Sequence, residues 1–392
     1  CAPSRGHTPL GFIYSHVLGG PSSEEECVLI EATANFLLGS LLFTGGVRCG
    51  LMLLRRGATA NDLFKSKTPL SLAFLGIYVF FMVLVLNVPQ MEALPLEWRF
   101  HGLRITWSLM RIMLLGICGV AITVSWYTAR RQVMAVVLVG ILGLAAFVGA
   151  ERYLLSPIHG SLTDNLQESG VFRQTSDSSC APAALATLLR VWDISTTESQ
   201  VAELAQTSRM GTSMPQLIVA AQSFGMDGHE LSPSLATLRR INRPGILSVW
   251  LKNGNRKLPH AVALLGADSQ TYFIADPAHG QIFALSPQEL AEIWRQEYVP
   301  IFRPDELYIT RQETVHSLRS LGYLPHSQTA DSDAPVSSEA IAKAISQLQE
   351  DHGLWATGTL DDETRLILTG PFLEGTPTLK TVAAFLQASS PS

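Results

Sequence analysis

Four long apolar stretches in the first 155 residues constrain this chain most strongly. They cover residues 28–47, 69–88, 105–127 and 132–150, and each contains at most one charged residue. Their lengths are close to the ~20 residues that an α-helix needs to cross a bilayer. Core helices of soluble proteins rarely run so long without a polar face. The sequence therefore predicts four transmembrane helices within residues 28–151.

The apolar bias is confined to this first part of the chain. Only 16% of the 392 residues are charged, against about 25% in an ordinary soluble protein, and the remainder beyond residue 155 has a normal soluble composition. This length favours two or three domains of roughly 100–200 residues. The net charge of −5 gives no basic character for nucleic acid. The sequence contains no Gly-x4-Gly-Lys-Ser/Thr loop, so nothing indicates a nucleotide as a partner.

Positive charge gathers in the loops that should face the cytoplasm. Five basic residues lie between the first two spans, and two more, Arg130 and Arg131, link the last two. Acidic residues mark the segment before the first span. Because basic loops stay in the cytoplasm, we expect residues 1–27 and everything after Glu151 on the extracytoplasmic, periplasmic side of a bacterial inner (cytoplasmic) membrane. The five basic residues are Arg48, Arg55, Arg56, Lys65 and Lys67.

Two charges inside the apolar stretches, Glu31 and Arg111, lie near the outer ends of their predicted helices. Long side chains at helix ends can reach the interface, so we expect structural roles, with the two residues as a candidate pair. The sequence begins at Cys1. Either it is incomplete, or Cys1 is the acylated first residue of a mature lipoprotein, and both interpretations stay open.

Cys180 is the one cysteine of the soluble part. It has no neighbouring cysteine for a disulfide, and no Cys/His spacing indicates a metal site. Asp177, Ser178 and Ser179 are good N-cap residues before an Ala/Leu-rich run, so Cys180 should begin a helix. The positive end of the helix dipole favours a thiolate there. Alone, such a cysteine is usually an inert buried residue; its surroundings favour a nucleophile.

A base and an orienting carboxylate follow in the predicted strands. Residues 245–251, 259–266 and 272–276 are typical of three buried strands, with His260 opening the second and Asp276 ending the third before Pro277. A hairpin of the last two would place the imidazole beside the carboxylate. Gln174, six residues before Cys180, could donate its amide to an oxyanion, together with the Cys180 backbone N–H.

The alternatives are ordinary structural roles. His260 could be a satisfied core histidine, Asp276 a turn residue and Asp177 a helix cap. His279 is a rival base, but it lies in a Pro-Ala-His-Gly turn rather than in a strand. The ordered set favours catalytic geometry at Cys180 and His260.

The order Gln174-x5-Cys180, His260 at a strand and Asp276-Pro277 after the next resembles the bacteriocin-processing (double-glycine leader) cysteine peptidases, which have a papain-like fold. Residues 211–217 and 220–225 resemble the family's middle helical region. The resemblance covers residues 168–305 and implies Cys180 as nucleophile, His260 as base, Asp276 as orienting residue and Gln174 as oxyanion donor. In that family's exporters the domain precedes a transporter in the cytoplasm, whereas here it follows the membrane helices.

The C-terminal residues 310–392 predict a small helical domain. Helices are expected over 314–324 and 340–349, with a polar linker between them, and a third helix capped by Asp361 or Asp362. The pieces Leu321-Gly-Tyr-Leu, Gly353-Leu and Gly358-Thr-Leu-Asp resemble peptidoglycan-binding-like three-helix modules. That resemblance implies wall binding, and the alternative is an interaction or packing role.

The predicted architecture is therefore multi-domain. It has an extracytoplasmic N-terminal segment (1–27), four transmembrane helices (28–151), an α+β papain-like cysteine peptidase domain (165–305) and an all-α C-terminal domain (310–392). We expect a cell-envelope peptidase with a Cys180–His260–Asp276 triad, a peptide or protein substrate and no cofactor or metal. The alternatives are a silent scaffold with the peptidase fold, and leader removal for a separate exporter.

Overall fold

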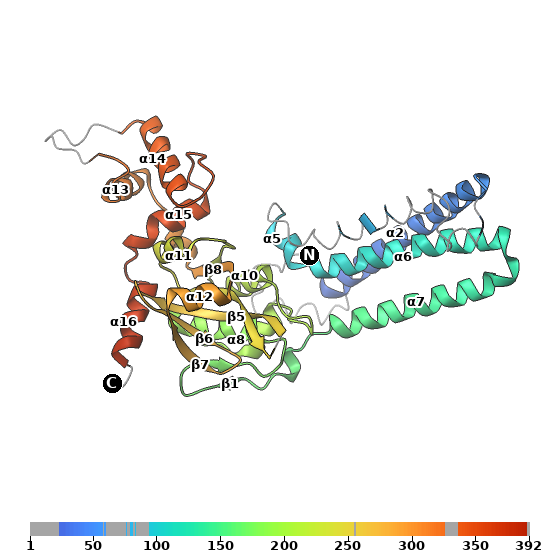
Figure 1. The fold of residues 1–392 in the computed structure, drawn as a ribbon, viewed down its shortest axis with the longest axis horizontal. Coiled ribbons are helices and arrows are strands. Elements are labelled where there is room, and N and C mark those ends of the chain that lie inside the picture. The colour runs from blue at the N-terminus through green and yellow to red at the C-terminus, as the bar shows by residue number, and fades with distance from the viewer. Residues whose placement is uncertain are drawn as a thin grey trace, which may run out of the picture. The chain divides into compact units, whose positions relative to one another are not determined.

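The computed structural model describes residues 23–57, 59, 76, 79–80, 83, 94–254, 256–325 and 336–389. The chain divides into two compact units, Cys1–Leu155 and Ser156–Ser392 (Figure 1). Residues 327–335 of the predicted polar linker, and most of the predicted N-terminal segment 1–27, lie outside the described residues.

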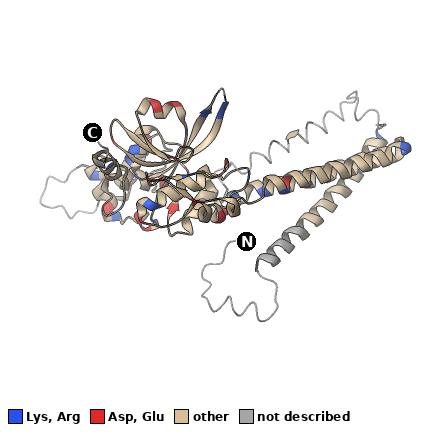
Figure 2. Ribbon diagram, turned by 90° about the horizontal axis from the view of Figure 1, so that it is seen from below, with Lys and Arg blue, Asp and Glu red and all other residues tan. Residues whose placement is uncertain are grey.

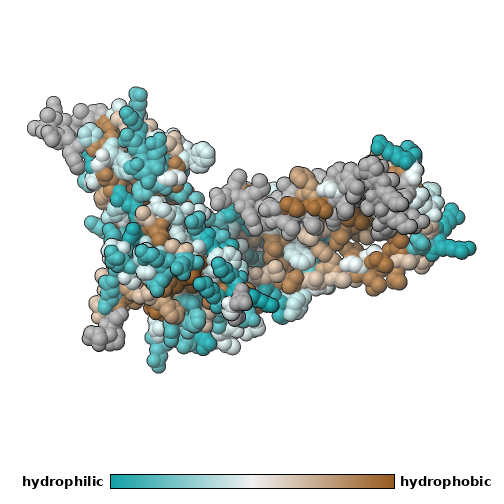
Figure 3. All heavy atoms as spheres, in the orientation of Figure 1, coloured by the Kyte–Doolittle hydropathy of each residue, from teal (hydrophilic) through white to brown (hydrophobic). Residues whose placement is uncertain are grey.

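Among the described residues, three helices of the first unit are long and apolar enough to cross a membrane. They are α2 (Ser23–Arg55), α6 (Gly102–Thr128) and α7 (Val133–Leu154). Long stretches of α6 and α7 carry no charged residue (Figure 2), and apolar side chains are prominent on the face in Figure 3. These helices confirm apolar segments of spanning length at 28–47, 105–127 and 132–150. The predicted span 69–88 lies outside the described residues, apart from 76, 79, 80 and 83.

One ion pair joins two of these helices. Arg111 of α6 donates from Nη1 to Glu151 Oε2 of α7 at 2.9 Å, and from Nη2 to the hydroxyl of Ser108. The sequence offered Glu31 as its partner, but the Glu31 side chain lies outside those that the structure describes. A charge in an apolar helix needs a partner. The antiparallel neighbour α7 supplies it near the end of its apolar stretch.

The second unit contains a six-stranded sheet in the order β3-β8-β4-β5-β6-β7. Every neighbouring pair in it is antiparallel. The strands are β3 (Asp227–Gly228), β4 (Gly245–Asn253), β5 (Arg256–Ala267), β6 (Tyr272–Asp276), β7 (Gln281–Leu285) and β8 (Trp294–Phe302). The three predicted strands correspond to β4, β5 and β6. β5 begins before His260, because the β4–β5 hairpin continues through the pair Lys252–Lys257 to Asn253–Arg256.

Helices precede and follow the central strands along the chain (Figure 1). Helix α8 (Cys180–Leu189) lies against β5, and all its residues after Cys180 are buried. A short two-stranded ribbon, β1 (Asn165–Leu166) with β2 (Phe172–Arg173), precedes it. The remaining helices of this part are α9 (Glu198–Leu204), α10 (Met214–Gln222), α11 (Leu235–Ile241) and α12 (Pro287–Ile293).

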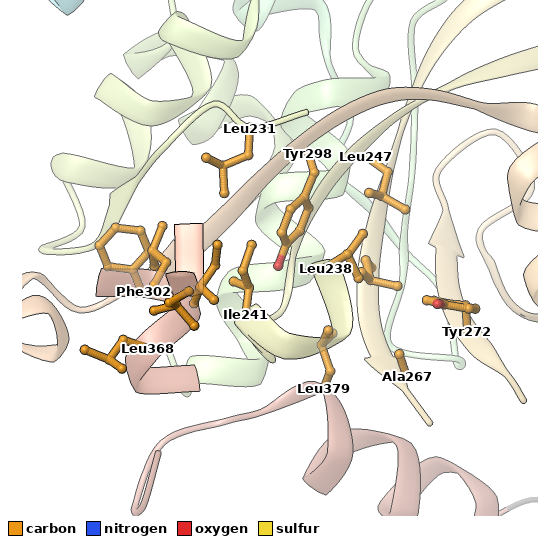
Figure 4. Close-up of a cluster of buried hydrophobic side chains, with 14 of the residues drawn as sticks. Leu231, Leu238, Ile241, Leu247, Ala267, Tyr272, Tyr298, Phe302, Leu368 and Leu379 are labelled. Carbon is orange, nitrogen blue, oxygen red and sulfur yellow. The ribbon is translucent and has the colours of Figure 1, made fainter. Parts of the chain in front are cut away.

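The C-terminal helices share their core with the sheet. One hydrophobic cluster includes residues of β4, β5 and β8 together with Leu368 and Leu379 of the C-terminal helices (Figure 4). Leu318 and Ile345 belong to the same cluster. Asp361 caps the predicted third helix through Thr364 N–H. The helices are α13 (Arg311–Ser320), α14 (Ser338–Asp351), α15 (Asp362–Thr369) and α16 (Leu379–Ser389).

A buried arginine also ties the C-terminal helices to the sheet's side of the core. Arg243 pairs with Glu306 at 2.8 Å and donates to the carbonyl of Leu366 and the hydroxyl of Thr369. A buried guanidinium is tolerated only when its donors are satisfied in this way. Residues 156–392 are therefore one compact unit in which the last helices complete the core.

Gly266 of β5 permits a close approach between the sheet and α16. A Cβ atom there would lie 2.6 Å from Ala383 N, 2.9 Å from Ala383 Cα and 3.1 Å from Leu379 O. These are backbone atoms, which cannot rotate away as a side chain can. Because Gly266 has no side chain, the backbone of α16 can pack directly against β5 at this position.

We predict that Gly266→Ala loosens α16. Overpacking of this kind costs roughly 1–3 kcal/mol, so hydrogen exchange in residues 379–389 of the full chain should accelerate. The matched control is Gly160→Ala, where a Cβ meets nothing within 4 Å and protection of α16 should persist. Equal protection of α16 in wild type and Gly266→Ala would contradict the assignment.

Candidate active site

Cys180 is the first residue of α8, as the sequence predicts. Its N-cap is Ser179, whose hydroxyl donates to Ser176 O and accepts from Ser176 N–H rather than bonding a helix amide. The thiol is half-buried. The N–H groups at the start of a helix carry partial positive charge, so the site favours the thiolate form of Cys180.

The loop before the nucleophile is fixed by a buried carboxylate. Glu198, at the start of α9, accepts from Thr175 N–H through Oε1 and from the Thr175 hydroxyl through Oε2, both at 2.9 Å. Its side chain is fully buried, and a buried carboxylate requires such partners. Glu198 gives no distinct signal in the sequence, because a Glu after Thr197 has the pattern of an ordinary capped helix start.

The register of β5 and β6 brings His260 to Asp276. Ala263 pairs with Ala275, so the next position, Val262, falls opposite Asp276, and His260 is the diagonal neighbour on the same face. His260 Nε2 lies 2.7 Å from Asp276 Oδ1, and both side chains are buried. The predicted hairpin therefore gives the predicted contact.

The second nitrogen of His260 is available to Cys180. Since Nε2 bonds Asp276, Nδ1 is the nitrogen of His260 left to interact with the Cys180 thiol. Burial raises the pKa of Cys180, but His260 and the backbone N–H groups of Ala261 and Ala181 outweigh burial and lower it below its usual range. The structure thus brings the three predicted residues together, with His260 bonded to Asp276 through one nitrogen and lowering the pKa of the Cys180 thiol on its other side.

The imidazole is correspondingly held in its charged form. Burial lowers the pKa of His260, but hydrogen bonds to Asp276 and Cys180 and their negative charges raise it to about 9. Opposite shifts in the two partners are the mark of a thiolate–imidazolium pair, whose two titration steps belong to the pair as a whole. The arrangement can supply both a nucleophile and a proton donor at neutral pH.

The Asp276 carboxylate has more donors than the sequence indicated. Oδ1 also accepts from Ala278 N–H at 2.8 Å, and Oδ2 lies 2.7 Å from His279 Nδ1. Burial would raise the pKa of Asp276, but His260, His279 and Ala278 together lower it below its usual range. His279, the rival base, instead bonds the far side of the carboxylate.

Gln174 lies next to the turn that follows Asp276. Its backbone N–H donates to Pro277 O at 2.9 Å, while its side-chain Nε2 donates to Ser176 O at 3.0 Å. Its Oε1 is buried without a partner among the described atoms. The amide is therefore near the loop that carries Cys180, engaged within that loop rather than open. No group of three or more His, Cys, Asp or Glu side chains that could hold a metal ion occurs among the described residues.

An antiparallel sheet with a cysteine-initiated helix packed on it, and a histidine–aspartate pair on neighbouring strands, defines a papain-like α+β cysteine peptidase domain. Residues 168–306 match the Peptidase C39 family. An uncharacterized protein of Methanothermobacter marburgensis is 33% identical over 148 residues, which cover 38% of this chain and 93% of that protein. The chain belongs to the Peptidase C39 family.

Two solved structures are also similar to this domain. The peptidase domain of Streptococcus ComA, a bi-functional ABC transporter involved in a quorum-sensing pathway, is 19% identical, covers 35% of this chain and 99% of that one, and gives a TM-score of 0.31. A double-glycine-motif protease from an AMS/PCAT transporter in complex with the leader peptide is 20% identical, covers 34% and 90% of the two chains, and gives a TM-score of 0.31.

We predict that Cys180 titrates below an ordinary thiol, because His260 lowers its pKa. Its alkylation by iodoacetamide, followed on the Cys180 peptide by mass spectrometry of the full chain, should persist to a lower pH than that of a model thiol. Asp276→Asn should raise the thiol pKa by about one unit, a tenfold loss of thiolate at low pH, because His260 loses its carboxylate. Asp193→Asn, on a left-handed turn that Asn also tolerates, should leave the profile unchanged. A profile of Asp276→Asn that matches the wild type would refute the coupling.

Proposed function

We propose that this chain is a membrane-anchored cysteine peptidase that hydrolyses peptide bonds. The observation that carries the proposal is the hydrogen bond of His260 Nε2 to Asp276 Oδ1 at 2.7 Å, in an imidazole that also lowers the pKa of the Cys180 thiol. Family membership supports the reaction class. In this proposal Cys180 is the nucleophile, His260 the acid and base, and Asp276 the residue that orients the imidazole.

The reaction proceeds through an acyl-thioester. The Cys180 thiolate attacks the scissile carbonyl carbon, and the carbonyl oxygen becomes an oxyanion. As the tetrahedral intermediate collapses, the C–N bond breaks and the His260 imidazolium gives its proton to the leaving amine. Neutral His260 then takes a proton from water, which attacks the thioester and releases a carboxylic acid and the thiolate.

Gln174 is the proposed side-chain donor to the oxyanion, together with the Cys180 backbone N–H. Its amide donates to Ser176 O in the free enzyme, so it must turn from this carbonyl when substrate binds. Catalytic hydrogen bonds are often completed only in the substrate complex. The unsatisfied Oε1 of Gln174 supports this view, because the resting position leaves one buried polar atom without a partner among the described atoms.

We predict that Cys180→Ala abolishes hydrolysis of a fluorogenic peptide library by the full chain. Gln174→Ala should lower kcat by about 10²–10³, as loss of one oxyanion donor does, while Cys180 alkylation stays as in the wild type. The control is Gln222→Ala on α10, whose amide bonds only Asp227 among the contacts described. Hydrolysis that survives in Cys180→Ala would mean that this domain is a silent binding or scaffold module.

The peptidase unit is proposed to lie on the outer side of the cytoplasmic membrane. The support is the basic loop after α2 and the Arg130–Arg131 link, both expected in the cytoplasm. With four spans the N-terminus and the peptidase share the outer side. The competing proposal, leader-peptide removal beside a separate exporter, requires a cytoplasmic peptidase.

The two locations differ in one direct measurement. Alkaline phosphatase fused after the last residue folds only outside the cytoplasm, where its disulfides form, so we predict an active fusion. A fusion of the same reporter within the basic loop at residue 56 should be inactive. The reverse pattern would place the peptidase in the cytoplasm and favour leader processing.

The helices α13, α14 and α15 are proposed to bind peptidoglycan, as their resemblance implies. Trp355 supports an exposed contact, because its side chain is 90% exposed on the loop before α15. The alternative, a packing role, is supported by the core that these helices share with the sheet. Cosedimentation of the full chain and its Trp355→Ala variant with purified wall sacculi separates the two roles.

A further inference from the structure

One carboxylate serves two histidines in this site. Asp276 Oδ1 bonds His260 Nε2, and Oδ2 bonds His279 Nδ1, each at 2.7 Å. The His260 side chain is buried, whereas that of His279 is 57% exposed. Because Asp276 lies between the two rings, His279 can influence Cys180 through Asp276 and His260 without touching the reacting atoms.

The turn that carries His279 is fixed on several sides. Gly280 N–H and His279 N–H both donate to Asp276 O, at 2.8 and 3.3 Å. Gly280 has a φ of +68°, and a Cβ there would lie 3.0 Å from Arg173 Cβ of the β1–β2 ribbon. The same ribbon holds Gly280 O through the Ser169 hydroxyl at 2.8 Å. His279 is thus presented to Asp276 by a rigid turn.

The ring of His279 is also held from the side of β7. It packs edge-to-face on Phe283, with ring centroids 5.6 Å apart. The charged residue Arg173 of β2 also lies against this turn, with its Cβ 3.0 Å from the position of a Cβ at Gly280. An imidazole that already packs on an aromatic neighbour loses little further conformational freedom when it bonds the carboxylate.

A carboxylate held through one oxygen can rotate about its Cβ–Cγ bond. In Asp276, Oδ1 already has two donors, His260 and Ala278 N–H, and His279 is the donor that holds Oδ2. With both oxygens bonded, rotation of the group would break a short hydrogen bond to one imidazole or the other. Asp276 is therefore kept with Oδ1 on His260.

We propose that His279 is a positioning residue of the triad, which locks the Asp276 carboxylate in the orientation that supports His260. This inference rests on the proposed function of Cys180 and His260. His279 therefore supports the reaction by holding Asp276 in place, which an ordinary turn residue would not do. His279 does not itself act as the base, because its Nδ1 is committed to Asp276.

The test is the pH dependence of Cys180 alkylation by iodoacetamide in the full chain. His279→Leu removes the donor to Oδ2, and the thiol midpoint should move up by about half a unit to one unit, a loss of roughly three- to tenfold in rate at low pH. His279→Asn places an amide nitrogen at the position of Nδ1 and should restore most of the wild-type profile. His316→Asn, an exposed histidine on α13, is the control.

The route through Asp276 gives a second readout. In an Asp276→Asn background, His279→Leu should shift the midpoint no further, because two residues that act through one contact are not additive. An unchanged midpoint in His279→Leu, or equal shifts with and without Asp276, would overturn the proposal. If His279→Leu fails to fold, loss of the low midpoint in His279→Asn overturns it as well. A wild-type midpoint at the ordinary thiol value would instead overturn the proposed function itself.

Discussion

The hydrogen bond between His260 and Asp276 is the contact on which the site depends. It exists because β5 and β6 pair with Ala263 opposite Ala275, which puts His260 and Asp276 on one face as diagonal neighbours. A shift of one residue would turn one of the two side chains to the other face. Since α8 packs on β5, the same strand sets the imidazole beside Asp276 and carries the helix that begins with Cys180.

Two buried carboxylates of the unit Ser156–Ser392 are each stabilised by several donors. Asp276 accepts from His260, His279 and Ala278 N–H, and Glu198 accepts twice from Thr175. A buried carboxylate without such partners would destabilise the fold by several kcal/mol, or it would become protonated. These contacts hold the loop before Cys180 and the turn after β6 in place. The pKa of the pair is thus a property of the fold around it.

Local patterns predicted much of this structure. An Ala/Leu run after Ser179 predicted α8, short continuous apolar runs predicted β4, β5 and β6, and the apolar lengths predicted α2, α6 and α7. Each of these signals lies within a short stretch of chain. The order of Gln174, Cys180, His260 and Asp276 then indicated the peptidase class, which the family match supports.

What the sequence could not predict depends on contacts between distant segments. Glu151 as the partner of Arg111, 40 residues away, follows from how α6 and α7 pack. The bond of His279 to the second oxygen of Asp276 follows from the shape of the turn held by the β1–β2 ribbon. The packing of α16 against Gly266 depends on the absence of a side chain at that position. None of these leaves a periodic or motif signal in the residues concerned.

The most direct test of the account is acyl transfer to Cys180. A peptidyl p-nitrophenyl ester should give a burst of nitrophenolate of one equivalent per chain, with the acyl group found on the Cys180 peptide as a hydroxylamine-sensitive thioester. His260→Ala, if folded as judged by hydrogen exchange, should lose the burst. A burst that persists in Cys180→Ala, or that His260→Ala leaves unchanged, would contradict the assignment of Cys180 as a nucleophile activated by His260.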